Sequence, residues 1–434
     1  MTKEPLTTAL SQTRTRLNRE QITGFWGAWA GWTLDGMDSV IYALVLNPAL
    51  TELLPRSGIK ATSANVGWAG SILFALFLIG WGLSLVWGPI ADRFGRSRVL
   101  ASTIFVYAIF TGFAALSQNV WQLGLFRLLA GIGIGGEWAL AGTYVAEAWP
   151  EDRRKMGAGY LQTGYYAGFF LASALNYMVA TRYGWRAMFW CGLAPVVVAF
   201  LVLIRVKEPQ RWHGVAKEKT VRGPSPLRRI FMAPYTRRTL ANTTLLSAAI
   251  CGLWAGAVYA PTAIVSLAEQ AGMTPRQAVK MSSLGMGLLS LGTILGCLAA
   301  PMVAERIGRR RALASYFLGM AACILLGFGW TFYVPYGLRP FIIVLVFLGF
   351  FGGNFAIFSL WLPEQYPTSA RATAFAFTTS FGRFLAAGIN LALGALVVRT
   401  GTLGKPVALT AIAFGVGLFA IPFAIETKGE TLPD

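Results

Sequence analysis

Residues 121–155 read WQLGLFRLLAGIGIGGEWALAGTYVAEAWPEDRRK and combine three features that any fold of this chain must accommodate. As far as Ala146 the side chains are mostly apolar or small, and about 20 such residues suffice for a helix to cross a bilayer core roughly 30 Å thick. Arg127 and Glu137 lie inside this run, although a charge at the centre of a membrane helix costs at least about 2.5–3.5 kcal/mol. The run then stops at Pro150 and a charged cluster. The stretch therefore predicts a membrane-spanning helix that contains buried charge and ends in a sharp polar turn.

The composition of the whole chain indicates a membrane protein with many spans. Of its 434 residues, 55% are hydrophobic and 13% are charged, whereas about a quarter of the residues in soluble domains are charged. The four cysteines all lie in apolar runs, no CxxC motif is present, and the single histidine is His213 in a basic loop. Because these residues offer no ordinary ligand set, we expect no metal site and no cofactor.

Apolar runs of spanning length recur twelve times along the chain. They cover approximately residues 21–46, 66–87, 99–117, 121–146, 156–181, 185–204, 239–268, 281–304, 312–333, 338–362, 373–399 and 406–425. The first run is longer than the apolar part of a secretion signal, so we interpret it as a span that is retained. The pattern predicts an all-α membrane protein with twelve transmembrane helices.

The net charge of +19 has two interpretations, nucleic-acid binding or the excess of Lys and Arg in the cytoplasmic loops of membrane proteins. With the N-terminus placed inside, 26 of the 37 basic residues fall on the inner side, 9 on the outer side and 2 within spans. This bias predicts that both termini are cytoplasmic, in a multi-pass protein of the plasma membrane, which is the inner membrane of a bacterium. The bias explains the charge without nucleic acid. We expect a monomer in the lipid bilayer.

The second half of the chain repeats motifs of the first half. Residues 92–98 (DRFGRSR) follow the second predicted span, and residues 305–311 (ERIGRRR) follow the eighth. Residues 147–150 (EAWP) follow the fourth span, residues 364–367 (EQYP) follow the tenth, and an arginine stands four residues past each proline. Duplicated six-helix halves are an architecture of secondary transporters. The predicted parts are an N-terminal tail (1–20), a first six-helix bundle (21–204), a central cytoplasmic loop (205–238), a second six-helix bundle (239–425) and a C-terminal tail (426–434).

These motifs resemble those of a known family. Residues 88–96 (GPIADRFGR) resemble the signature loop of the major facilitator superfamily, and residues 127–135 (RLLAGIGIG) resemble its fourth-helix pattern. The resemblance implies two six-helix bundles related by a pseudo-two-fold axis, with a substrate site between them near the middle of the membrane. It also implies secondary active transport by alternating access and no enzyme activity.

Other motifs point to particular branches of that superfamily. Residues 136–138 (GEW), 147–150 (EAWP) and 184–186 (GWR) together resemble the sialate and monocarboxylate proton symporters. Residues 35–38 (DGMD) resemble the first-helix pattern of the aromatic-acid proton symporters, and residues 426–432 (ETKGETL) resemble the tail of the sugar porters.

These resemblances favour proton-coupled uptake of a small organic anion, such as a monocarboxylate, a sialic-acid-like sugar acid or an aromatic acid. A sugar:proton symporter and a metabolite or drug exporter are the alternatives within the class. A channel is opposed by the duplicated motif loops, and a membrane enzyme is opposed by the lack of a histidine cluster or nucleophile pair.

Four ionisable residues within the predicted spans are candidates for proton coupling. Asp35 and Asp38 are three residues apart and share one helix face. At a rise of 1.5 Å per residue, Asp38 lies about 12 Å and Arg127 about 9 Å below the outer ends of their spans, so the two can pair. This pair could carry protons or be purely structural. Glu137 lies about 15 Å deeper than Arg127. It is a second proton site, a residue of the substrate path or a helix-packing residue.

Arg383 is the candidate for substrate binding. It lies ten residues into the eleventh span, and no acidic residue occurs in the neighbouring apolar runs of the second half. An unpaired buried cation is unfavourable, so a substrate carboxylate is a natural partner, with an acid of the first half such as Glu137 as the alternative partner. Gln162 and Asn354 are the polar span residues that we also expect at the site, although such residues often join helices instead.

Acidic and basic residues at the inner ends of the predicted helices form a further group. The resemblance implies that they make an inner gate of ion pairs that closes when the site faces outward. The alternative, a simple excess of basic residues on the inner side, explains the arginines but not the acids. The predicted gate residues are Asp92, Arg93, Arg96, Glu147, Arg154, Glu305, Arg306, Glu364 and Arg371.

Overall fold

A computed structural model describes residues 15–209, 212 and 225–433, and within these residues all regular structure is helical. The first half contains α1 (Arg19–Arg56), α2 (Ser63–Leu83), α3 (Trp87–Phe94), α4 (Arg96–Ala114), α5 (Val120–Ala148), α6 (Glu151–Leu175), α7 (Thr181–Cys191) and α8 (Pro195–Arg205). The second half contains α10 (Pro226–Ile230), α11 (Tyr235–Gln270), α12 (Pro275–Ile307), α13 (Arg309–Ile324), α14 (Leu338–Gly352), α15 (Asn354–Trp361), α16 (Arg371–Thr400), α17 (Gly404–Ala408) and α18 (Ala411–Ala420).

The helices of the described residues form twelve rods, which confirms the predicted number of spans. Nine rods are long and apolar enough to cross a membrane, and four of these join consecutive helices end to end: α2 with α3, α7 with α8, α14 with α15, and α17 with α18. The other three are α1, α6 and α11. Helix α1 bends by 64° before Pro48, which lacks a backbone N–H, and then continues past the predicted end at residue 46. Helix α6 begins with five charged residues.

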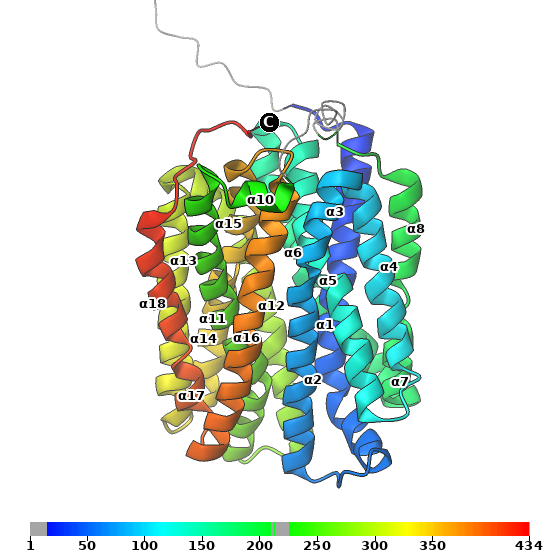
Figure 1. The fold of residues 1–434 in the computed structure, drawn as a ribbon. Helices are drawn as coiled ribbons and strands as arrows, with labels where there is room; N and C mark the ends of the chain where they lie inside the picture. Colours follow the sequence, from blue (N-terminus) through cyan, green and yellow to red (C-terminus); the bar gives the residue numbers. More distant parts are fainter. Residues whose placement is uncertain (1–14, 210–211, 213–224, 434) are drawn as a thin grey trace, which may run out of the picture.

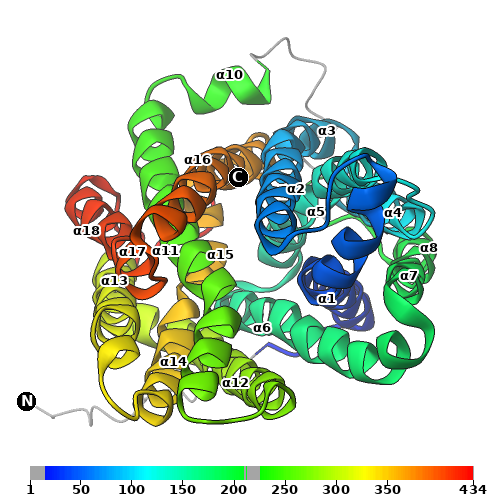
Figure 2. The same ribbon diagram turned by 90° about the horizontal axis from the view of Figure 1, so that it is seen from below.

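The twelve rods form two groups that stand side by side (Figure 1). Helices α1 to α8 make one group and helices α11 to α18 the other, and short α10 lies across one end. Along the seam between the groups α6 packs against α12 and α2 packs against α16, as the view from below shows (Figure 2). We call the end of the bundle that carries residues 92–98 and 305–311 the motif end. The chain also ends there, above the seam.

Glycines allow the rods within each half to touch backbone to backbone. A Cβ atom on Gly80 of α2 would lie 2.0 Å from the carbonyl oxygen of Leu128 in α5. In the second half, a Cβ on Gly296 of α12 would lie 1.9 Å from the carbonyl oxygen of Phe350 in α14. Small residues at such crossings let membrane helices gain close packing where water supplies no driving force. These two contacts fix the positions of neighbouring helices within each half, including α5, which carries Arg127 and Glu137.

We predict that Gly80→Ala lowers the melting temperature by several degrees, because the added methyl group overlaps a backbone carbonyl and overpacking of this kind costs about 1–3 kcal/mol. The matched control is Gly388→Ala on α16, where a Cβ would meet no atom within 4 Å. Thermal unfolding of the two purified variants, followed by fluorescence, measures the difference. Equal melting temperatures would show that the α2–α5 contact is not tight.

Candidate functional site

An ion pair joins α1 and α5 inside the first group of helices. Arg127 Nη1 lies 3.3 Å from Asp38 Oδ2, and neither side chain is exposed. The guanidinium stacks on the rings of Phe77 and Tyr42, with ring centres 4.4 and 4.8 Å away. Its Nε and Nη2 have no hydrogen-bond partner among the described residues. The two residues thus lie at equal depth, as the helical rise predicts, and the pair is buried but incompletely satisfied.

Two further acids, Asp35 and Glu137, lie on the same α1–α5 contact nearer the motif end. Both are fully buried, and none of their four carboxylate oxygens has a hydrogen-bond partner within the part of the chain that the structure describes. A Cβ on Gly31 of α1 would lie 2.1 Å from Glu137 Oε1, so this carboxylate rests against α1 one turn from Asp35. Ser39 lies close to Asp35 without a hydrogen bond of normal geometry.

Arg383 reaches this region from α16 of the second group. Its side chain is 3% exposed, Nη1 donates to the Thr379 carbonyl at 2.7 Å, and Nε has no hydrogen-bond partner among the described residues. The guanidinium lies over the ring of Trp81 at 4.0 Å and is 5.9 Å from the ring of Trp138. The arginine is therefore held between aromatic rings with part of its donor capacity unused.

The alternative pairing of Arg383 with Glu137 does not occur. No acid of the described residues forms an ion pair with Arg383, since no carboxylate oxygen among them lies within 4.0 Å of its guanidinium. The physical reason is the depth at which Glu137 lies in the bundle. Its carboxylate faces Gly31, about one turn (5.4 Å) nearer the motif end than Asp35.

Gln162 and Asn354 lie where α6 of the first group meets α15 of the second. The Trp138 indole donates to Ser359 Oγ at 2.9 Å, and Ser359 Oγ donates to Gln162 Oε1 at 3.5 Å. Asn354 donates to the Phe351 carbonyl, while its own buried oxygen has no partner among the residues described. A short chain of hydrogen bonds thus crosses the seam and begins at Trp138, whose ring lies 5.9 Å from the Arg383 guanidinium. The sequence carried no signal for Trp81 or Ser359, because aromatic and hydroxyl side chains are abundant in every span.

The motif end is closed by ion pairs in which each of two glutamates bridges the two groups of helices. Glu147 accepts from Arg96 of its own group at 3.1 Å and from Arg371 of the other group at 2.7 Å. Glu364 accepts from Arg309 of its own group at 2.9 Å and lies 3.5 Å from Arg154 of the other.

Further cross-group contacts repeat this symmetry. Asp92 pairs with Arg96 at 3.0 Å, and its other oxygen accepts from the backbone N–H of Thr373 at 2.9 Å. Glu305 pairs with Arg309, and its other oxygen accepts from Lys155 at 2.6 Å.

Two of the predicted gate residues lie outside this network of ion pairs. Arg93 and Arg306 are exposed and form no ion pair with any described residue. Each follows its acid by one position, and neighbours on a helix point to different faces, whereas the arginine four positions on returns to the acid. The spacing of Asp92 and Arg96 recurs in Glu305 and Arg309, so the repeat itself carried the signal for Arg309.

After the last helix of each group, a glutamate caps the N-terminus of a helix at the motif end. Glu208 accepts hydrogen bonds from the backbone N–H groups of Arg96 and Ser97 at 2.7 and 3.0 Å, and Glu426 accepts from those of Arg309 and Arg310 at 2.9 and 3.1 Å. A carboxylate at a helix N-terminus satisfies free donors and complements the helix dipole. These caps place Arg96 and Arg309 at the start of α4 and α13.

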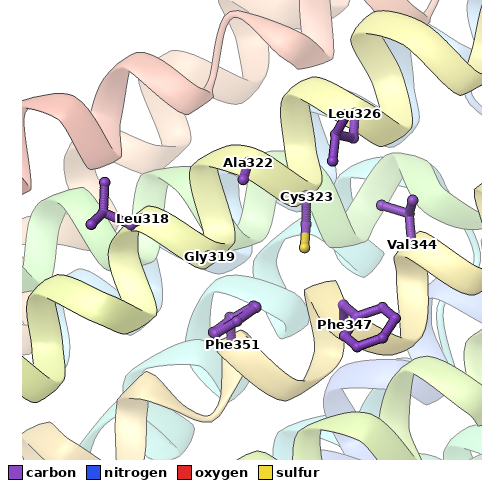
Figure 3. A pocket seen from close by; sticks show the side chains of 8 residues that line it. All are labelled: Leu318, Gly319, Ala322, Cys323, Leu326, Val344, Phe347 and Phe351. Carbon is purple, nitrogen blue, oxygen red and sulfur yellow. The ribbon is translucent and has the colours of Figure 1, made fainter.

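One apolar cavity lies away from these charged residues. It has a volume of about 420 Å³ and lies between α13 and α14 (Figure 3). Gly319, Phe347, Phe351 and other apolar side chains line it, together with the Cys323 thiol. Because it offers no charged group or hydrogen-bond donor of normal strength, it does not fit an anionic ligand.

The sequence comparisons agree with this geometry. The Major Facilitator Superfamily profile matches residues 29–389. A probable 4-methylmuconolactone transporter of Cupriavidus pinatubonensis is 29% identical over 422 residues, which cover 94% of this chain and 92% of the relative. The sialic acid transporter NanX of Escherichia coli is 26% identical over 420 residues, which cover 95% and 93%.

The fold is shared with solved transporters. The proton:xylose symporter XylE, solved with 6-bromo-6-deoxy-D-glucose, superposes with a TM-score of 0.75 at 19% identity over 95% of this chain and 98% of that one. The chain is a member of the Major Facilitator Superfamily. It is an integral multi-pass membrane transporter, and among its relatives are transporters of organic acids.

We predict that Asp92→Asn opens the motif end, because it removes the charge opposite buried Arg96 and weakens the contact with Thr373 across the seam. The readout is the labelling rate by a polar maleimide of a single cysteine at Ala376, which is buried beside Gly88 at the seam. The rate should rise several-fold.

The matched control is Arg93→Gln, which alters an exposed neighbour outside the network and should leave the labelling rate unchanged. If Asp92→Asn labels no faster than the parent protein, the ion pairs do not keep this end closed.

Proposed function

We propose that this transporter takes up a small organic anion together with protons by alternating access. The observation that carries the proposal is Arg383: a buried guanidinium at the seam, without an acidic partner among the described residues and with an unused donor. Arg binds a carboxylate through two parallel hydrogen bonds, and a buried charge is stabilised when it is paired. A bound carboxylate would satisfy Arg383, whereas a neutral sugar would leave it without a direct ion-pair partner.

The substrate class follows from the same groups and from the relatives. Aromatic rings of Trp81 and Trp138 flank Arg383, which suits a compact or planar acid. The relatives are described as transporters of 4-methylmuconolactone and of sialic acid. A monocarboxylate, a sialic-acid-like sugar acid and an aromatic acid are therefore the substrates to be tested first.

The distribution of charge supports an orientation of the protein in the membrane and indicates which side of the site is closed. The excess of basic residues at the motif end supports a cytoplasmic position for this end and for both termini, in the inner membrane if the source is a bacterium. The ion pairs across the seam would then close the cytoplasmic side, so that the described conformation has its site shut off from the cytoplasm. Release of substrate requires that these pairs separate.

Asp38 is our proposed proton carrier, with Arg127 as its partner. When Asp38 is ionised the ion pair holds α1 against α5, and when it is protonated the pair weakens and the helices are free to rearrange. Asp35 and Glu137 are the alternative carriers. The pairing of Asp38 with a dedicated cation distinguishes it from both of them.

Purified protein in proteoliposomes tests the function. Uptake of a carboxylate should saturate, should be driven by an imposed pH difference that is acid outside, and should be abolished by a protonophore. Sugars form the second arm of the screen, because sugar symport is the alternative. Uptake of xylose or glucose but of no acid would overturn the proposal. Uptake that occurs only when the pH difference is reversed, with the acid side inside, would indicate an exporter.

We predict that Arg383→Ala abolishes substrate binding and that Arg383→Lys weakens it strongly. Lysine retains the positive charge but loses the planar fork that matches a carboxylate. Loss of one charge-assisted contact corresponds to about 1.5–3 kcal/mol, or roughly a tenfold to hundredfold rise in Kd. Isothermal titration or ligand-induced thermal shifts measure the change. Wild-type affinity of the Ala variant for the anion would rule out this site.

We predict that Asp38→Asn loses accumulation driven by pH but still binds substrate and exchanges it across the membrane. The amide imitates the protonated acid permanently, so the loading and release of a proton stop while the pocket remains. Counterflow and pH-driven uptake in the same vesicle preparation separate the two activities. Continued accumulation against a gradient would assign the proton to Asp35 or Glu137 instead.

A further inference from the structure

Five buried charged residues form a central cluster at the seam: Asp35, Asp38, Arg127, Glu137 and Arg383. None is more than 3% exposed. Every other buried charged residue of the described part of the chain belongs to the motif-end network. The central cluster must therefore balance its own charge in a low-dielectric environment, where an uncompensated charge is strongly unfavourable.

Among the described residues the surrounding helices add no other buried charge to this cluster, because the remaining buried charged residues of α4, α6 and α16 are Arg96, Arg154 and Arg371 of the motif-end network. Helix α2 contains no ionisable residue, and α8 contains only Arg205 at its end. Three tyrosines lie beside the cluster: Tyr42 of α1, which contacts the Arg127 guanidinium, Tyr107 of α4 and Tyr165 of α6. The Tyr107 hydroxyl donates to the Gly31 carbonyl at 3.5 Å, beside the Glu137 carboxylate. Tyrosine hydroxyls are neutral, so the balance rests on three acids and two arginines.

With all five groups ionised the cluster carries one negative charge in excess, and one proton makes it neutral. The geometry indicates where that proton lies. Asp38 has Arg127 at 3.3 Å, whereas among the described residues no cation lies within 4.0 Å of Asp35 or Glu137 and no donor bonds to either. The Glu137 carboxylate lies against Gly31, one helical turn from Asp35, so the two unpaired acids are neighbours on the α1–α5 contact.

We propose that Asp35 and Glu137 hold one proton between them throughout the transport cycle, and that the cluster takes up one further proton with each monocarboxylate, so that transport is electroneutral. This inference rests on the proposed function. A substrate carboxylate at Arg383 adds one negative charge to a cluster that is neutral when empty. One additional proton, carried by Asp38, restores neutrality, and the proton shared by Asp35 and Glu137 stays in place.

The charge balance predicts what each acid contributes. Removing one member of the Asp35–Glu137 pair removes an acid together with the proton it shares, so the balance is unchanged. Removing both members removes two acids and only one proton, so the empty cluster gains one positive charge. A substrate anion then neutralises it without any proton. The single variants should therefore still move one proton with each substrate, whereas the double variant should move none.

The experiment measures the ratio of protons to substrate in proteoliposomes, with a pH-sensitive dye and a radiolabelled carboxylate such as 4-hydroxybenzoate or sialic acid, whichever the wild-type protein carries. Glu137→Gln and Asp35→Asn should turn over more slowly but keep a ratio of about one, because a neutral amide replaces the protonated member of the pair. The double variant Asp35→Asn/Glu137→Gln should bind substrate but move it without protons.

A second readout is the response to membrane potential, set with valinomycin and potassium at constant pH difference. Wild-type uptake should not change with the potential, whereas uptake by the double variant should change, because it moves the anion alone. Wild-type uptake that follows the potential would overturn the charge balance, and this measurement does not depend on the folding of any variant. Melting temperature and counterflow verify that each variant is folded and binds substrate.

The outcomes separate this inference from the proposed function. If Glu137→Gln binds substrate but loses pH-driven accumulation, Glu137 is itself a cycling carrier, and the shared, resident proton is ruled out although proton symport stands. If no carboxylate is transported with protons by the wild-type protein, the proposed function itself fails.

Discussion

The structure depends on how a helical bundle of low polarity accommodates ionised side chains. Water is absent from the bilayer core, so a charged group there must find a partner within the protein or remain unfavourable. The buried charges of this protein fall into two sets that differ in how many partners they have. At the motif end every buried acid has at least two basic or polar partners, whereas in the central cluster Asp35, Glu137 and part of Arg383 have none among the described residues.

The satisfied network at the motif end explains how two groups of helices can form one closed surface and still separate. Glu147 and Glu364 each take one arginine from their own group and one from the other. Within each group the pairs join the start of one helix to the end of another: Arg96 of α4 to Glu147 of α5, and Arg309 of α13 to Glu364 after α15. Across the seam each of these acids has a further partner in the other group, and these contacts can be exchanged for water when the end opens. Pairing within each group can then persist while pairing across the seam is lost, which suits a protein that moves as two rigid halves.

The unsatisfied central cluster has the opposite character. Its aromatic and glycine surroundings keep water out, yet its acids and its arginine retain unused hydrogen-bonding capacity. In a native protein such groups need an explanation, and binding of an anion and of protons supplies one. The hydrogen bonds from Trp138 through Ser359 to Gln162 link both halves, and Trp138 also lies 5.9 Å from Arg383 of this cluster. Binding at Arg383 and closure of the seam therefore share Trp138 as a common element.

The sequence by itself determined the class of fold and the charged residues of the site. Hydropathy and helix length are properties of consecutive residues, so the twelve spans, the duplicated motifs and the equal depths of Asp38 and Arg127 could all be predicted from the chain. Partner choice could not be predicted, because it depends on how each rod is rotated and on which faces meet across the seam. Glu147 and Arg371 are 224 residues apart, and Arg96 and Arg309, not Arg93 and Arg306, turn toward the acids. Only the tertiary structure decided that Arg383 lies beside Trp81 and Trp138 at the seam, since the packing of α16 against α2 and α5 sets that geometry.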